Sequence, residues 1–138
     1  MTYQEFADEI CELQYVVQRN WEGLPDDPGA DIDLFATRDG AKLISALAQS
    51  LPIKVDVRYP GDGYYPETIG KELLADYRLY KGWKIPTRQA AYDALMYHSL
   101  IHKENHPYEQ KLATMFLQLH PPVEPDDKGV GYYAHRRM

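Results

Sequence analysis

The sequence has one cysteine, no long apolar run and no excess of positive charge, and each absence excludes a class of protein. Cys11 has no partner for an internal disulfide, which favours a reducing cytoplasmic setting over a disulfide-built secreted fold. No stretch approaches the roughly 20 apolar residues of a membrane helix, and the first residues lack the pattern of a signal peptide. The sequence therefore predicts a soluble cytoplasmic protein with no membrane partner.

The charge balance is acidic. The 138 residues include 15 Lys and Arg and 21 Asp and Glu, which gives a formal net charge of −6. A negative chain is repelled by a phosphate backbone, so nucleic acid is a less expected partner than a small molecule or another protein. The hydrophobic fraction of 44% and the aromatic fraction of 12% are sufficient for one folded domain with its own core.

Periodicity and turn residues predict an α+β first half. Thr2 and Glu5 form a capping-box pattern at the start of a helix, and Asp39 is expected to cap a second helix that Pro52 ends. The expected order is a helix over 3–13, a short strand over 15–17, a loop over 22–29, a strand over 31–36, a helix over 39–51 and a strand over 53–58. The short loop favours an antiparallel first pair, and the intervening helix favours a crossover to a parallel third strand. A small mixed β-sheet with helices on one face follows.

The second half reads as mainly helical. The sequence predicts helices over 66–76, 88–103 and 107–119, with two short strands around Lys81-Gly82. The last two helices make a C-terminal helical pair. Residues 1–120 are therefore expected to form one domain, with a core over 1–60 and a helical part over 61–120. Residues 121–138 are expected to form a C-terminal arm, with an added edge strand as one option.

Carboxylates alternate with apolar residues along two of the expected strands. Asp31 and Asp33 share one side of the first, and Asp56 lies on the polar side of the next. Three like charges held together are unfavourable unless they are protonated or bridged by a cation, and oxygen-only ligands suit Mg²⁺ or Mn²⁺. The pattern predicts a divalent-metal site for phosphate chemistry, and its plain alternative is a set of solvated acids on a wet sheet face.

The order of these motifs resembles the DNA polymerase beta-like nucleotidyltransferase superfamily over residues 15–58. The resemblance implies that Asp31, Asp33 and Asp56 are catalytic residues that hold two Mg²⁺ or Mn²⁺ ions. It further implies transfer of a nucleoside monophosphate from a nucleoside triphosphate such as ATP to a hydroxyl or phosphate acceptor of unknown identity. Three motifs are similar to small uncharacterised nucleotidyltransferase-like domains found with polysaccharide genes, namely Arg19-Asn20-Trp21, Gly61-Asp62-Gly63-Tyr64-Tyr65 and Tyr97-His98-x-x-x-His102-Lys103.

The chain departs from the superfamily pattern at one place. Arg19-Asn20 stands where Gly-Ser usually lets backbone amides bind the triphosphate. Arg19 is expected to replace those amides with a charged fork, and Asn20 with its side chain. Further candidates for nucleotide or substrate binding are Arg58, Asp62, His98, His102 and Lys103.

Several alternatives stay open from the sequence. The two histidines have the spacing of zinc ligands, but half-buried helix histidines bonded to the acid-rich strands are the favoured interpretation. Residues 61–65 read as a substrate loop or as a plain turn. A rival function is a non-catalytic nucleotidyltransferase-fold module, binding or regulatory, that keeps the carboxylates but binds a partner protein or senses a nucleotide. Another rival is a toxin–antitoxin-type enzyme acting on an RNA end, against which the net charge weighs.

Overall fold

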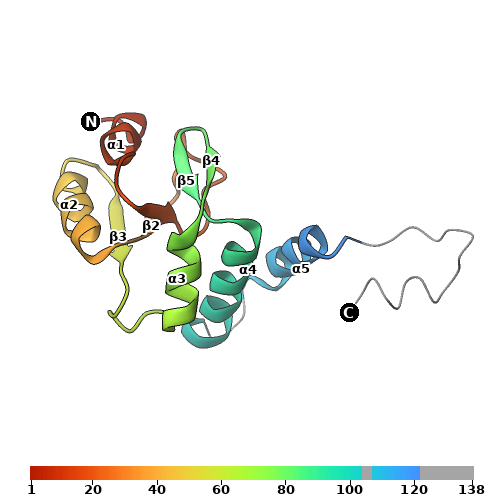
Figure 1. Ribbon diagram of the computed structural model, residues 1–138. Coiled ribbons are helices and arrows are strands. Elements are labelled where there is room, and N and C mark those ends of the chain that lie inside the picture. The colour runs from red at the N-terminus through yellow and green to blue at the C-terminus, as the bar shows by residue number, and fades with distance from the viewer. Residues whose placement is uncertain (104–106, 122–138) are drawn as a thin grey trace, which may run out of the picture.

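The computed structural model describes residues 1–103 and 107–121, which form five α-helices, one π-helical segment and five strands (Figure 1). The helices are α1 (Tyr3–Ile10), α2 (Arg38–Ala48), α3 (Glu67–Ala75), α4 (Arg88–Tyr97), the π-helical η1 (His98–His102) and α5 (Glu109–Leu119). The strands are β1 (Tyr15–Val17), β2 (Asp31–Ala36), β3 (Lys54–Arg58), β4 (Arg78–Tyr80) and β5 (Trp83–Ile85). The α+β class is confirmed, whereas the expected arm lies outside the described residues beyond Pro121. None of the helices in the described ranges has the length and apolar character needed to cross a membrane.

The strands make one small mixed sheet and one hairpin. The three-stranded sheet has the order β1-β2-β3, with β1 antiparallel and β3 parallel to the central β2. This confirms the expected antiparallel pair and the crossover through α2. β4 and β5 pair antiparallel, and Lys81 and Gly82 make the turn between them with φ values of 50° and 86°. The second is a backbone conformation that glycine adopts at low cost.

Helices cover both faces of the three-stranded sheet, and the prediction of helices on one face only is wrong. Ile32 and Leu34 point toward α1 and α2, where they join a core that includes Phe6 and Ile44. Phe35 points to the opposite face and packs in a second core with residues of α3 and α4. Figure 1 shows α2 and α3 on opposite sides of the sheet. α3 and α4 are needed on this face because Phe35, which follows the aspartates along β2, would otherwise be exposed to water.

Several helix boundaries differ from the sequence prediction by one to three residues, and three of the differences have a clear local cause. α1 ends at Ile10 rather than at residue 13, because tighter turns then reverse the chain into β1. The N-cap of α2 is Thr37, whose Oγ1 accepts from the Gly40 amide at 3.1 Å, so the prediction that Asp39 caps this helix is wrong. The helix expected over 88–103 changes to π geometry at His98 and closes where the Lys103 amide donates to the His98 carbonyl at 3.1 Å.

Candidate functional site

The three aspartates lie on one face of two neighbouring parallel strands. Asp33 of β2 is directly opposite Asp56 of β3, and Asp31 is opposite Lys54. Because side chains alternate along a strand, Asp31 and Asp33 share a face, and the parallel register gives Asp56 that same face. All three are partly buried. The strand alternation therefore brings these acids together as the sequence predicts, while their role remains a prediction.

The electrostatics of Asp33 show that the acids interact. Burial raises the pKa of its carboxyl group, the charge of Arg19 lowers it, and the charges of Asp31 and Asp56 raise it again. The net result is a pKa above the ordinary aspartate value. A cation or a proton near Asp33 would therefore relieve a repulsion that the fold imposes.

Arg19 lies two residues after the end of β1 and next to Asp33. It is buried, with only 7% of its side chain exposed. Its Nε is 3.7 Å from Asp33 Oδ2. Its terminal nitrogens donate to Gln18 Oε1 at 3.1 Å, to the Tyr65 hydroxyl at 3.1 Å and to the Tyr64 hydroxyl at 2.8 Å. The guanidinium group is therefore committed to internal partners. As placed, it orients Asp33 and the two tyrosines rather than presenting an open fork to a ligand.

Arg58 is the more accessible arginine of this face. Its Nε is 3.4 Å from Asp56 Oδ2, and its guanidinium carbon lies 4.4 Å from the centre of the Tyr64 ring. That Nε is nevertheless a buried donor without a hydrogen-bond partner in the described part of the chain. Its nearest anionic group is the Asp56 carboxylate, so Arg58 offsets part of the negative charge on this face.

Asp62 organises the loop that follows β3. Its two carboxylate oxygens accept from the Tyr59 amide at 3.1 Å and from the Tyr64 amide at 2.9 Å. Gly61 and Gly63 on either side have φ values of 89° and 85°. Asp62 is thus the centre of a tight turn, and this turn delivers Tyr64 and Tyr65 to the network around Arg19.

The two histidines contact Tyr64 and each other, rather than the acidic strands as expected. His102 Nε2 lies 3.0 Å from the Tyr64 carbonyl, and His98 Nδ1 lies 2.9 Å from His102 Nδ1 and 3.1 Å from the Tyr64 hydroxyl. Burial is the main cause of a lowered pKa in both, to about 3 for His98, so both rings are neutral near pH 7. A carbonyl only accepts, so His102 carries its proton on Nε2.

That assignment fixes the rest of the chain of hydrogen bonds. His102 Nδ1 is then an acceptor, and His98 Nδ1–H donates to it. The Tyr64 hydroxyl oxygen accepts a hydrogen bond from Arg19 and faces the same His98 donor. Its own hydrogen is left to donate elsewhere, which makes Tyr64 a candidate ligand donor beside the acids.

Two candidates lie at the margin of the site. Asn20 is exposed with a φ of 59°, and its Oδ1 accepts from Lys111 at 3.4 Å. The exposed Lys103 side chain has no polar partner in residues 1–103 and 107–121.

The sequence prediction missed Gln18, and it named Tyr64 and Tyr65 only as members of the 61–65 loop, without a role for their hydroxyl groups. The signal for the tyrosines was their place in a Gly-Asp-Gly turn directly after the third acidic strand.

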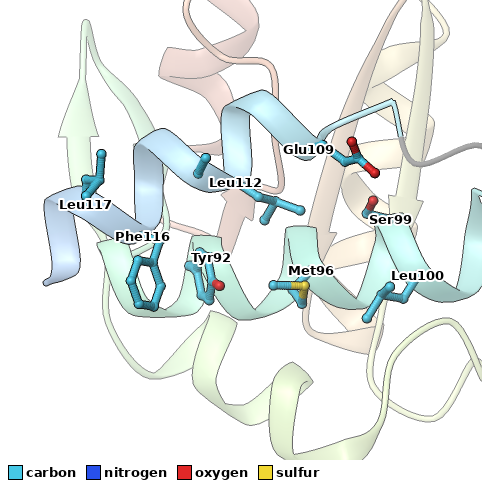
Figure 2. A pocket seen from close by; sticks show the side chains of 9 residues that line it. Tyr92, Met96, Ser99, Leu100, Glu109, Leu112, Phe116 and Leu117 are labelled. Atoms are coloured by element: carbon cyan, nitrogen blue, oxygen red, sulfur yellow. The ribbon is translucent and has the colours of Figure 1, made fainter. Parts of the chain in front are cut away.

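Two hollows have none of the three acids in their walls. One of about 630 Å³ opens between α4 and α5 and is mainly apolar, with Tyr92, Met96 and Phe116 facing into it from the two helices (Figure 2). Another of about 710 Å³ lies between the 60–66 loop and α3, with Phe35 and Tyr65 in its wall. Only the second shares a residue with the network around Arg19, so it adjoins the candidate site.

The site as a whole combines partly buried acids, two arginines and a tyrosine donor, which suits a phosphate-bearing ligand and a cation. Within the described ranges, no three His, Cys, Asp or Glu side chains are gathered closely enough to hold a metal ion by themselves. An ion bound to the described residues would therefore need further ligands, such as phosphate oxygens of a substrate. Comparison of the sequence and structure with protein-family models, curated proteins and solved structures found no match.

Proposed function

We propose that this chain is a metal-dependent nucleotidyltransferase that moves a nucleoside monophosphate from a nucleoside triphosphate to a hydroxyl or phosphate acceptor. The observation that carries the proposal is the direct pairing of Asp33 with Asp56, with Asp31 on the same face. The fold places these charges together although burial and mutual repulsion raise the pKa of Asp33. Perturbed acids held at a partly open site are typical of functional sites.

A divalent ion fits the chemistry of this donor set. Carboxylate oxygens suit Mg²⁺ or Mn²⁺, and Mg²⁺ is commonly held by one or two carboxylates together with substrate phosphates. Asp33 and Asp56, which are directly opposite each other, would supply its carboxylate ligands, and substrate phosphates would complete them. Because the three aspartates are not gathered closely enough to form a three-carboxylate site, the expectation that Asp31 is a third ligand is not supported, and Asp31 would contribute its negative charge on the same face. When bound, the ion would supply charge neutralisation at the transferring phosphoryl group.

The chain's own side chains have distinct tasks in this proposal. Arg19 would position Asp33, because its Nε faces the Asp33 carboxylate while its terminal nitrogens are fixed by hydrogen bonds such as the one to the Tyr64 hydroxyl. Arg58, whose side chain is 38% exposed, would bind a phosphate oxygen through its guanidinium group, as charge-assisted hydrogen bonds favour. Tyr64 would donate its free hydroxyl hydrogen to the same ligand. Preorganised donors of this kind stabilise charge at little reorganisation cost.

The test is pyrophosphate release from each of the four nucleoside triphosphates, with Mg²⁺ or Mn²⁺ and a panel of polyols and sugar phosphates as acceptors. Asp33→Asn should lower the rate by about 100-fold or more, because even outer-shell changes at metal sites cost 10–100-fold. The matched control is Asp39→Asn, which removes an exposed acid on α2 and should leave the rate unchanged. Full activity in Asp33→Asn would end the proposal.

A second candidate is a nucleotide-binding module without transfer activity. It is favoured by the contacts of Arg19, whose terminal nitrogens donate to groups within the protein. Arg19 therefore does not offer a free guanidinium group to the triphosphate in place of the Gly-Ser backbone amides. This candidate predicts Mg²⁺-dependent binding of a nucleoside triphosphate but no pyrophosphate release by the wild-type protein. The same assay, run beside a binding measurement, separates the two.

A further inference from the structure

A hollow of about 480 Å³ lies on another part of the surface, among β4, the start of α4 and the side of α5. Three cationic side chains line it, namely Arg78, Arg88 and Lys111, together with a single acid, Glu22. This local excess of positive charge contrasts with the net charge of −6 for the whole chain. The volume is within the range of small-molecule sites.

The aromatic ring of Trp21 lies near two of these cations. The guanidinium carbon of Arg78 is 6.0 Å from the ring centre, and Lys111 Nζ is 5.7 Å from it. Arg78 is further held by its Nε, which donates to the Pro86 carbonyl at 2.7 Å. Lys111 pairs with Glu22 at 2.9 Å. The hollow therefore has an ordered wall, in which Glu22 offsets only one of the three cations.

Arg78 and Arg88 are left without an anionic partner. In the part of the chain that the structure describes, neither forms an ion pair, and the terminal nitrogens of Arg78 have no hydrogen-bond acceptor. The pKa of Arg78 lies below its ordinary value, mainly through burial and also through the charge of Arg88. Two cations that repel each other beside a hollow would be stabilised by an anion between them.

The start of α4 adds to the positive electrostatic potential at the hollow. Arg88 is the first residue of that helix, Thr87 caps it, and its first turn contains no acidic residue. The partial positive charge of a helix N-terminus favours an anion in the same direction as the arginines. Thr114 and Gln118 supply polar groups on the α5 side.

We propose that this hollow is a binding site for the phosphate groups of a phosphorylated small molecule, with Arg78 and Arg88 as its principal ligands. A diphosphate matches it best, because two neighbouring phosphates can each take one guanidinium fork. The phosphate can belong to a nucleoside triphosphate or to a phosphorylated acceptor. This inference does not depend on the transfer activity proposed above.

The test is calorimetric titration of pyrophosphate, ATP and glucose 1-phosphate into the protein in EDTA at low salt, so that no metal bridges the ligand to the acids. Arg88→Gln and Arg78→Gln should each weaken pyrophosphate binding by about tenfold, as expected for one lost charge-assisted contact. Lys42→Gln, which removes an exposed cation on α2, is the matched control and should bind like the wild type. Binding should also weaken as salt is added.

The ligand of highest affinity identifies the source of the phosphate, ATP indicating the nucleotide and glucose 1-phosphate an acceptor. Arg88 is exposed, so its variant keeps the test valid even if Arg78→Gln fails to fold. Wild-type affinity in both arginine variants, an equal loss in Lys42→Gln, or no binding by the wild type would overturn the proposal. The failure of this site would leave the pyrophosphate-release assay of Asp33→Asn unaffected.

Discussion

Replacement of Arg19 with methionine should lower the free energy of unfolding by about 3 kcal/mol at pH 7. Removing one member of a buried ion pair costs about 3–5 kcal/mol, and hydrogen bonds to charged groups contribute about 1.5–3 kcal/mol each. Arg19 has both kinds of contact, with Asp33 and with Gln18, Tyr64 and Tyr65. Part of the loss is offset because both tyrosine hydroxyls keep another partner. For a chain of this size, the melting temperature should fall by roughly 10 °C.

The loss should depend on pH with a definite sign. In the wild type, the pKa of Asp33 lies above the ordinary aspartate value, so the folded state binds its proton more tightly than the unfolded state does. Its contribution to stability therefore decreases as pH rises from about 4 toward the folded pKa. Without Arg19, burial and the neighbouring acids still raise the pKa of Asp33, and nothing from Arg19 lowers it. The pKa of Asp33 in the folded variant is therefore higher, and the loss of stability with rising pH extends to higher pH. Arg19→Met should thus be less destabilising at pH 5 than at pH 8.

A double-mutant cycle measured by urea unfolding checks this account. Asp33→Asn removes the charge that Arg19 neutralises, so the double variant should recover about 1 kcal/mol or more of the loss in Arg19→Met at pH 8. Equal destabilisation by Arg19→Met at both pH values, with no coupling to Asp33, would show that Arg19 acts only through packing and neutral hydrogen bonds.

Three other changes test separate parts of the structure. Measured by urea unfolding, Thr37→Ala should lower the free energy of unfolding by about 1 kcal/mol, and Asp39→Ala should lower it by under about 0.5 kcal/mol. A larger loss in Asp39→Ala than in Thr37→Ala would show that Asp39 is the cap. Buried His98 stays neutral down to a pKa of about 3, so its own contribution to stability should fall by up to about 1.4 kcal/mol per pH unit below about pH 6.5. Glu72, whose pKa is raised to about 7, contributes with the opposite sign in this range, so the measurement is the difference in slope between the wild type and His98→Gln. Tyr64→Phe should cost about 1 kcal/mol by the loss of its contacts with Arg19 and His98, and an unchanged melting temperature would count against the network.

Strand alternation and turn chemistry made much of the fold predictable. The period-two pattern over 31–36 and 53–58 is strong because one face of each strand enters a core, and a register shift would expose it. The same pattern set Asp31, Asp33 and Asp56 on one face. The hairpin around Lys81-Gly82 followed from a glycine that adopts positive φ.

The errors arose where tertiary contacts decide between local options. Thr37 and Asp39 are both good caps, and only the backbone path after β2 selects Thr37. The helix cover on the acid-bearing face could not be read from Phe35 alone, because one apolar residue does not show which segment will pack on it. Likewise, the burial of Arg19 depends on a turn more than 40 residues later that delivers both tyrosines.

The central claim, that the acid-bearing face binds a nucleoside triphosphate through a divalent ion, is tested most directly by thermal unfolding. A ligand that binds only the folded state adds about 2.7 kcal/mol at 100 times its Kd, which is a shift of several degrees here. The account predicts that a nucleoside triphosphate raises the melting temperature of the wild type and of Asp39→Asn more in Mg²⁺ than in EDTA, whereas Asp33→Asn shows no such difference between Mg²⁺ and EDTA. An equal Mg²⁺-dependent shift in Asp33→Asn, or no Mg²⁺-dependent shift with any of the four triphosphates in the wild type, would contradict it.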